Sequence, residues 1–205
     1  MTTRDQDILK TLSQRIRILT ADQISTHWWN SNRAASFTRL KAMASWGLLE
    51  LTPAFAQILP PVTVPLLQWN PKKASPNMGA VSYALKARWS MPVQSTIIVT
   101  ATKRGAATVG GFGGRLPRAS ETAHDIGMAE VYLHFRHHHP EREKGWRPEA
   151  FLYEQGWGQR ERLPDAMIVT RAEKTVIEFG GAYSKNKLQA FHAAMADKNL
   201  GYELW

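Results

Sequence analysis

The chain has 205 residues, no cysteine, and 26 Lys and Arg residues against 17 Asp and Glu residues, which gives a formal net charge of +9. The lack of cysteine excludes disulfides and cysteine-ligated zinc. The excess of basic over acidic residues favours a polyanionic partner, with nucleic acid as the first candidate. A basic protein without such a partner would have the same composition. The longest apolar runs are too short to span a bilayer and the charged N-terminus is unlike a signal peptide, so we expect a soluble protein of the cytoplasm with no membrane partner.

The first 51 residues have the pattern of three short helices. Apolar residues recur at three- and four-residue steps from Ile8 to Ile16, as on a helix with one buried stripe. Capping residues predict a second helix at 21–29 and a third at about 32–45. With the apolar segment 48–51 as a strand, this order predicts a winged helix-turn-helix.

The third helix carries most of the side chains expected to contact double-stranded DNA. Arginine presents a forked donor to guanine or phosphate, and a helix N-terminus itself favours phosphate. Phe37, Leu40 and Ala44 are predicted to face inward, which leaves the polar residues of this helix, together with two basic residues further on, for the DNA. These candidates are Asn32, Arg33, Ser36, Arg39, Lys41, Lys103 and Arg104. The alternative is a winged helix that contacts another protein, with its arginines solvated.

Prolines crowd the next segment, about 53–92, and forbid long helices there. We predict that this segment is an insertion between the two strands of the wing, at 48–51 and 96–100, because loops tolerate insertions at little cost. Within it, a short edge strand is expected at 65–69 and a short helix at 82–89.

The glycine-rich segment 110–118 is predicted to be a flexible linker that closes a first domain of residues 1–109. Its glycines are not followed by the Gly-Lys-Ser/Thr of a phosphate loop. Residues 119–205 then alternate between helix and strand. The predicted elements are a helix at 121–137, strands at 149–154, 165–170 and 175–179, a helix at 185–198 and a strand at 202–205. The fold class is therefore α+β, with a second domain of order α-β-β-β-α-β.

Two carboxylates fall on adjacent predicted strands of this second domain. Asp165 begins one strand, and Glu178 follows thirteen residues later near the end of the next. The pair and the order of elements resemble the restriction-endonuclease-like superfamily, written PD-(D/E)xK, in which such carboxylates bind Mg²⁺ or Mn²⁺ against a phosphodiester. The lysine of that motif belongs two residues after the glutamate, where this chain has Gly180.

Three further residues could complete such a site. Glu130, in the preceding predicted helix, is where this superfamily often has an additional acid, and Lys185 or Lys187 could reach the space of the missing lysine. Alternatively, a turn satisfies Asp165, while Glu178 must face a cleft or find a partner. We expect a domain that has lost catalysis and needs no cofactor for binding; an active nuclease would need Mg²⁺ or Mn²⁺ on Asp165 and Glu178.

Two other groups of residues invite a functional interpretation. His134 and His138 are one helical turn apart, but no acid or cysteine at ligand spacing completes a metal site, which favours a charged helix C-terminus. Trp146 and Trp157 could stack on bases, although closure of the core is the default for buried indoles.

The whole chain resembles the replication-relaxation family of bacterial plasmids and mobile elements, in which a winged helix precedes a nuclease-like domain. The residues that carry the resemblance are Asp7-Ile8-Leu9, Leu19-Thr20 and Arg39-Leu40, then His124-Asp125-Ile126, Leu163-Pro164-Asp165-Ala166 and Val176-Ile177-Glu178-Phe179-Gly180-Gly181.

The resemblance implies a DNA-associated accessory or regulatory role in replication, relaxation or transfer. An active metal-dependent endonuclease is one alternative. Another is an interaction module that binds a relaxase, a toxin or a conjugation component. A homodimer on a palindromic site is common for winged helices, but no heptad or exposed apolar stripe in this chain demands one.

Overall fold

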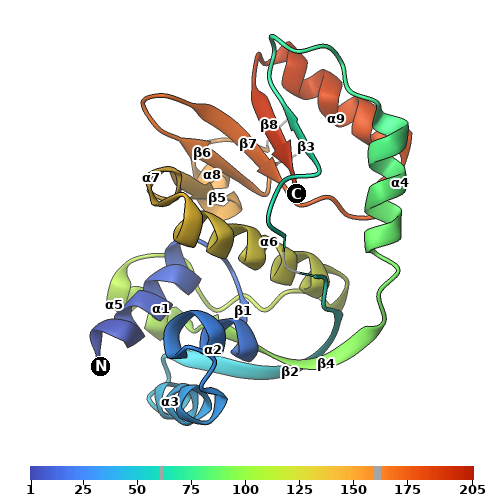
Figure 1. Ribbon diagram of the computed structural model, residues 1–205. Coiled ribbons are helices and arrows are strands. Elements are labelled where there is room, and N and C mark those ends of the chain that lie inside the picture. The colour runs from blue at the N-terminus through green and yellow to red at the C-terminus, as the bar shows by residue number, and fades with distance from the viewer. Residues whose placement is uncertain (61, 159–162) are drawn as a thin grey trace. The chain divides into compact units, whose positions relative to one another are not determined.

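The computed structural model describes residues 1–60, 62–158 and 163–205. It is a mixed α+β protein, as the α+β class predicted from the sequence requires (Figure 1). The chain divides into two compact units. One contains a three-stranded sheet and the other a five-stranded sheet. Among the helices of the described residues, none combines the length and the apolar content needed to cross a membrane.

Unit 1 comprises residues 1–58 and 92–133. Its elements in chain order are α1 (Thr3–Gln14), β1 (Leu19–Thr20), α2 (Ala21–Trp29), α3 (Arg33–Ser45), β2 (Leu49–Gln57), β4 (Val93–Ala101), α5 (Lys103–Val109) and most of α6 (Ala119–His138). Strand β4 lies between β1 and β2, and both pairs are antiparallel.

Local chemistry explains where the helices of unit 1 begin and end. The Thr2 and Thr20 hydroxyls cap α1 and α2, each within a reciprocal capping box. Between α2 and α3, Asn30 and Ser31 adopt left-handed conformations with φ of 48° and 65°. The Asn32 side chain then caps α3, so the starts predicted for the second and third helices from their capping residues are confirmed.

The ribbon of β2 and β4 pairs over nine residues of each strand, from Leu49 opposite Ala101 to Gln57 opposite Val93. It is longer than the predicted strands at 48–51 and 96–100. Pro53 lies within β2, which is at the edge of the sheet, where a residue without an N–H group is tolerated.

The glycine-rich segment that was expected to be a linker packs closely on unit 1. The Phe112 amide donates to the Ser13 carbonyl at 2.7 Å, and the Gly114 amide donates to the Ala101 carbonyl at 2.8 Å. A Cβ atom at Gly111 or Gly113 would lie 2.4 or 2.6 Å from a backbone oxygen. Glycine is thus required here for close approach of two backbones rather than for flexibility.

Unit 2 comprises residues 59–91 and 134–205. Its elements are β3 (Leu67–Trp69), α4 (Met78–Arg88), the end of α6, α7 (Pro140–Glu143), β5 (Trp146–Pro148), α8 (Glu149–Glu154), β6 (Ala166–Val169), β7 (Lys174–Glu178), α9 (Lys185–Asp197) and β8 (Gly201–Leu204). The sheet has the order β3-β8-β7-β6-β5, in which β7 and β8 are parallel and the other pairs antiparallel.

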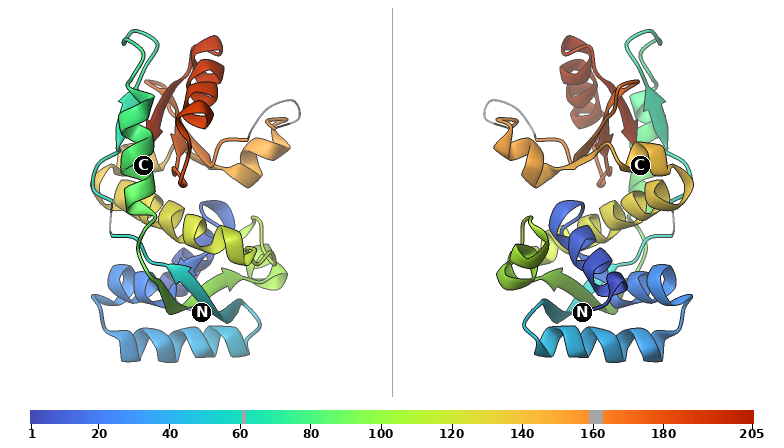
Figure 2. Two further views of the ribbon diagram at one scale, coloured as in Figure 1. Left: turned by 90° about the vertical axis from the view of Figure 1, so that its right-hand side faces the viewer. Right: turned by 90° about the vertical axis from the view of Figure 1, so that its left-hand side faces the viewer.

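The proline-rich segment follows β2 and precedes β4, as predicted, but its β3 and α4 belong to unit 2. Strand β3 pairs with β8 from Leu67 opposite Leu204 to Trp69 opposite Tyr202. Helix α4 lies beside α9, and Leu85 packs there among apolar residues of both helices and of β8 (Figures 1 and 2). The expected domain boundary therefore differs from the structure, because this segment buries its apolar residues against unit 2.

The strand predicted at 149–154 is wrong, since these residues form α8 and the strand is β5, immediately before it. The β-prone run Phe151-Leu152-Tyr153 favoured a strand. In the structure only Leu152 of this helix is buried, and the Glu149 amide donates to the Asp165 carbonyl. Tertiary packing of one leucine overrides the local propensity.

Candidate functional site

The two predicted metal ligands lie next to each other across two strands of unit 2. Asp165 immediately precedes β6 and Glu178 ends β7, and the pairing of Ala166 with Ile177 places these carboxylates at the next position of the ladder. The Asp165 carboxylate accepts a hydrogen bond of 2.8 Å from the Phe179 amide. The register of β6 and β7 thus brings together the two carboxylates that the sequence places on adjacent strands.

Glu178 is buried, with 1% of its surface exposed, and it contacts a tyrosine. The Tyr183 hydroxyl donates to Glu178 Oε1 at 3.0 Å. The Lys187 ammonium lies 3.6 Å from the centre of the Tyr183 ring, so it contacts the same tyrosine that is hydrogen-bonded to Glu178. Lys185 is exposed at the start of α9. Tyr183 was not predicted from the sequence, and only its position five residues after the glutamate could have suggested it.

Helix α4 fills the space where the motif lysine would begin. A Cβ atom at Gly180 would lie 2.5 Å from Leu85 Cδ2 and 3.1 Å from Leu204 Cδ1. The Gly180 carbonyl accepts hydrogen bonds of 2.7 Å from both Arg88 Nη2 and Trp89 Nε1. These bonds hold the C-terminal end of α4 against the segment that follows β7. The position is therefore occupied by an apolar side chain from a segment almost one hundred residues earlier.

Arg88 of α4 is a cation whose contacts lie at the end of β7. Its guanidinium lies 4.4 Å from the centre of the Phe179 ring and also donates to the Trp205 carbonyl at 2.9 Å. Burial lowers the pKa of Arg88 to about 10. Arg88 donates to two backbone carbonyls, so its contacts stabilise the packing of α4 against the chain segments that follow β7 and β8.

The additional acid predicted for this site, Glu130, belongs to unit 1. It accepts a hydrogen bond of 2.7 Å from Gln23 Nε2, and burial raises its pKa. Within residues 1–60, 62–158 and 163–205, no group of three or more His, Asp or Glu side chains has an arrangement that could hold a metal ion. What the structure brings together is a pair of carboxylates, each engaged by a neighbouring donor.

The histidine tract at the end of α6 is a cluster of rings. His134 lies 4.9 Å from His138 and 5.4 Å from His139, measured between ring centres, and also contacts Trp205. Burial, and then the nearby positive groups, lower the pKa of His134. The lowered pKa favours the neutral form of the His134 imidazole at this helix end.

Of the predicted DNA contacts on α3, three lie on its exposed surface. Arg33 has 76% of its side chain exposed and lies 3.0 Å from the Asp22 carboxylate. Lys41 is exposed, with its ammonium over the Phe37 ring, and Asn32 accepts from the Ala35 amide as the helix cap. These groups are available to a partner at modest cost, since their present contacts are at the surface.

Two other predicted contacts on α3 are engaged within unit 1. Ser36 is buried and donates to the Arg33 carbonyl, because the buried face of this helix is Ser36, Leu40 and Met43. The predicted inward face had Phe37 and Ala44 in place of Ser36 and Met43. Arg39 donates to both oxygens of Asp5, and its guanidinium lies 4.8 Å from the centre of the Trp46 ring.

A hollow on unit 1 lies between the start of α3 and strand β4. Arg33, Ala34 and Phe37 line it from the helix, and residues 95–97 line it from the strand. The remaining predicted DNA contacts, Lys103 and Arg104, are exposed in the first turn of α5. Basic groups of unit 1 therefore occur on α3 and on α5.

The two tryptophans considered for base stacking belong to the packing of unit 2. Trp146 is 1% exposed and lies 5.7 Å from Phe135 between ring centres. Trp157 packs against the core of the unit, with the Lys174 ammonium over its ring. Core packing, the default interpretation of these residues, is confirmed.

Comparison of the chain with protein-family models, curated proteins and solved structures gives no match.

Proposed function

We propose that the protein is a DNA-binding accessory or regulatory factor whose unit 1 is a winged helix-turn-helix. The observation that carries this proposal is the arrangement of α2 and α3, joined by a short turn and followed by the antiparallel ribbon β2–β4. In winged helix-turn-helix proteins the second helix of the pair enters the major groove. Arg33 and Lys41 on the exposed surface of α3 support the same role for this helix.

We further propose that unit 2 is a PD-(D/E)xK-like domain that does not cleave DNA. From α6 onward the elements α6, β5, β6, β7, α9 and β8 follow the order α-β-β-β-α-β once the short helices α7 and α8 are set aside. Most of α6 belongs to unit 1, and β3 and α4 of unit 2 are additional to this order. Leu85 fills the space beside Gly180, and each carboxylate of the pair already accepts a hydrogen bond. A metal-bound phosphodiester would need both of these carboxylates and a nearby cation.

The host process is proposed from the resemblance to the replication-relaxation family. We place the protein in the cytoplasm, acting on plasmid or mobile-element DNA during replication, relaxation or transfer. A protein partner from the same process would fit an accessory role.

The test is DNA binding by the full chain and by two variants with equal loss of charge. Arg33→Gln with Lys41→Gln should weaken binding to a duplex of about 30 base pairs by tenfold or more, since each specific contact is worth roughly 1–3 kcal/mol. The control, Lys72→Gln with Lys73→Gln, changes two exposed lysines of unit 2 and should stay close to wild type. No binding by the wild type at low salt, or equal loss in both variants, would refute the proposal.

The register of Asp165 and Glu178 favours one second candidate, an active endonuclease. Incubation of supercoiled plasmid with the protein and Mn²⁺ should leave the plasmid intact. Cleavage that disappears in Asp165→Asn would establish the enzyme instead. Retention of a protein partner after nuclease treatment, without any shift of DNA, would indicate an interaction module.

A further inference from the structure

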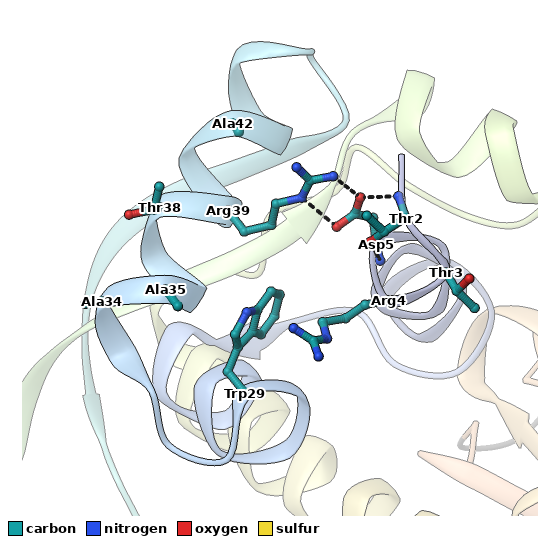
Figure 3. A pocket seen from close by; sticks show the side chains of 10 residues that line it. All are labelled: Thr2, Thr3, Arg4, Asp5, Trp29, Ala34, Ala35, Thr38, Arg39 and Ala42. Atoms are coloured by element: carbon teal, nitrogen blue, oxygen red, sulfur yellow. Dashed lines mark hydrogen bonds and ion pairs between the residues drawn. The ribbon is translucent and has the colours of Figure 1, made fainter.

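A second concave surface of unit 1 lies on the other side of α3. An open groove of about 970 Å³ lies between the first turn of α1, the end of α2 and α3 (Figure 3). We call it the α1–α3 groove. Its lining includes Arg4 and Asp5 of α1, Trp29 of α2, and Ala35, Thr38 and Arg39 of α3.

Two arginines line this groove, and each is held against a tryptophan. The Arg4 guanidinium lies 4.7 Å from the centre of the Trp29 ring, and Figure 3 shows the two side chains next to each other. Among the described residues, no carboxylate lies within ion-pair distance of Arg4. Stacking orients the plane of a guanidinium and leaves the N–H groups at its edge free to donate.

Arg39 is held more firmly. Its Nε and Nη2 atoms donate to the two oxygens of Asp5, and its face lies over Trp46. Asp5 is buried, whereas 30% of the Arg39 side chain is exposed. The only acid in the lining is thus covered by its arginine, and guanidinium groups form the charged part of the groove.

The shape of the groove suits a chain better than an enclosed small molecule. It is open to solvent, and apart from Arg39 its α3 wall consists of short side chains such as Ala35 and Thr38. Planar guanidinium groups match the geometry of phosphate oxygens, and apolar walls accept sugar carbons. A polymer of alternating phosphate and sugar has both kinds of group.

We propose that the α1–α3 groove binds the phosphodiester backbone of the DNA strand that flanks the contact made by α3. This assignment rests on the proposed function. It adds Arg4 to the binding surface and makes Arg39, which the sequence already suggested as a DNA contact, a phosphate contact. The two arginines lie on different helices, so one strand bound to both would fix the orientation of α3 on the duplex.

The first test compares two single-charge variants on the same helix. Arg4→Ala should lower DNA affinity several-fold at physiological salt and reduce the slope of log Kd against log salt by about 0.9, as expected for one lost phosphate contact. Lys10→Ala removes one exposed cation of α1 that does not line the groove, and its slope should equal that of the wild type. Equal slopes for all three proteins would overturn the assignment.

The second test places a charge in the groove itself. Ala35→Glu and Ala35→Gln are matched in size, and position 35 is exposed in the first turn of α3, where both residues are compatible with the helix. The glutamate should weaken binding by tenfold or more relative to the glutamine. Equal affinity of the two variants would overturn the assignment and indicate a neutral occupant.

These outcomes are separable from failure of the proposed function. A wild-type protein that binds no DNA refutes the proposed function itself. A wild-type protein that binds DNA while the Arg4 and Ala35 variants match their controls refutes the groove alone. Circular dichroism and thermal melting of each variant establish that it is folded.

Discussion

At the scale of single residues, Asp5 and Arg39 show how an ion pair can join sequence-distant helices. Asp5 is fully buried, closes the capping box of α1 through the Thr2 amide, and accepts from Arg39 of α3. The arginine bonds hold the pKa of Asp5 well below its ordinary value, at about 2. A residue that looks like a free recognition side chain in the sequence therefore has a role in stability.

We expect Asp5→Asn to destabilise the protein at neutral pH by about 2 kcal/mol, because a buried charged hydrogen-bond acceptor is lost. The pKa of this carboxyl is depressed from 3.8 to about 2, so its stabilisation is complete above pH 4 and is lost as the pH falls toward 2. Urea unfolding of both proteins at pH 7, 4 and 2 should show the difference shrink at acidic pH. Asp22→Asn, which breaks an exposed pair, should cost less than about 1 kcal/mol.

The pKa of Glu130 is shifted in the opposite direction to that of Asp5. Burial raises its pKa, so the stability associated with this group is greatest below its ordinary pKa and declines as the pH rises through the raised value. Glu130→Gln keeps an acceptor for Gln23 and removes the buried charge. The melting temperature of the variant should therefore change less between pH 5 and pH 8 than that of the wild type. If the melting temperatures of the two proteins changed by the same amount between pH 5 and pH 8, this expectation would be contradicted.

At the scale of secondary-structure elements, α4 is the feature that most changes the interpretation of unit 2. Ser82, near the middle of the helix, donates to the Tyr183 carbonyl at 2.7 Å, and Arg88, its last residue, donates to the Gly180 carbonyl. Leu85, between these contacts, is fully buried. The helix is an integral part of this unit, although it is encoded before most of it.

We expect Gly180→Ala to cost roughly 1–3 kcal/mol, because its new Cβ atom would overlap Leu85. Leu85→Ala alone should cost about 2–5 kcal/mol through the cavity it leaves. The double variant should lose less stability than the two single losses combined, since each change relieves the other. Denaturant unfolding of the four proteins measures this coupling, and strict additivity would mean that the two positions do not touch.

At the scale of the whole molecule, positive charge is distributed over both units. Unit 1 contains 11 Lys and Arg residues against 7 Asp and Glu residues, and unit 2 contains 15 against 10. Neither unit is neutral, so both can contribute to the attraction of a polyanion.

We therefore expect the affinity of the full chain for duplex DNA to fall steeply with salt, by about a thousandfold or more between 50 and 200 mM if six or more phosphates are contacted. Fluorescence anisotropy titrations at several salt concentrations provide the slope. A flat dependence would show that phosphate contacts do not dominate binding and would count against a DNA-binding role.

Local signals predicted much of the fold. Thr20, Asn32 and Ser184 cap helices where their side chains indicated starts, and Asp165 and Glu178 lie on adjacent strands as predicted. Side-chain orientation was harder to predict. Ser36 and Met43 are buried in place of the predicted Phe37 and Ala44, while Leu40 belongs to both faces. The buried face of α3 is therefore rotated by less than the roughly 100° between successive residues, a shift that local spacing cannot resolve when small residues surround it.

The sequence by itself determined the α+β class, the helix starts and the adjacency of the two carboxylates, because capping and strand alternation act over a few residues. The tertiary structure alone decided that residues 59–91 belong to unit 2, that glycines 111 and 113 serve close packing, and that Leu85 occupies the space beside Gly180. The contacts of α4 and β3 join positions that are about one hundred residues apart or more in the sequence. Such pairings depend on which apolar surface remains uncovered when the rest of the unit has folded, and no local pattern specifies that surface.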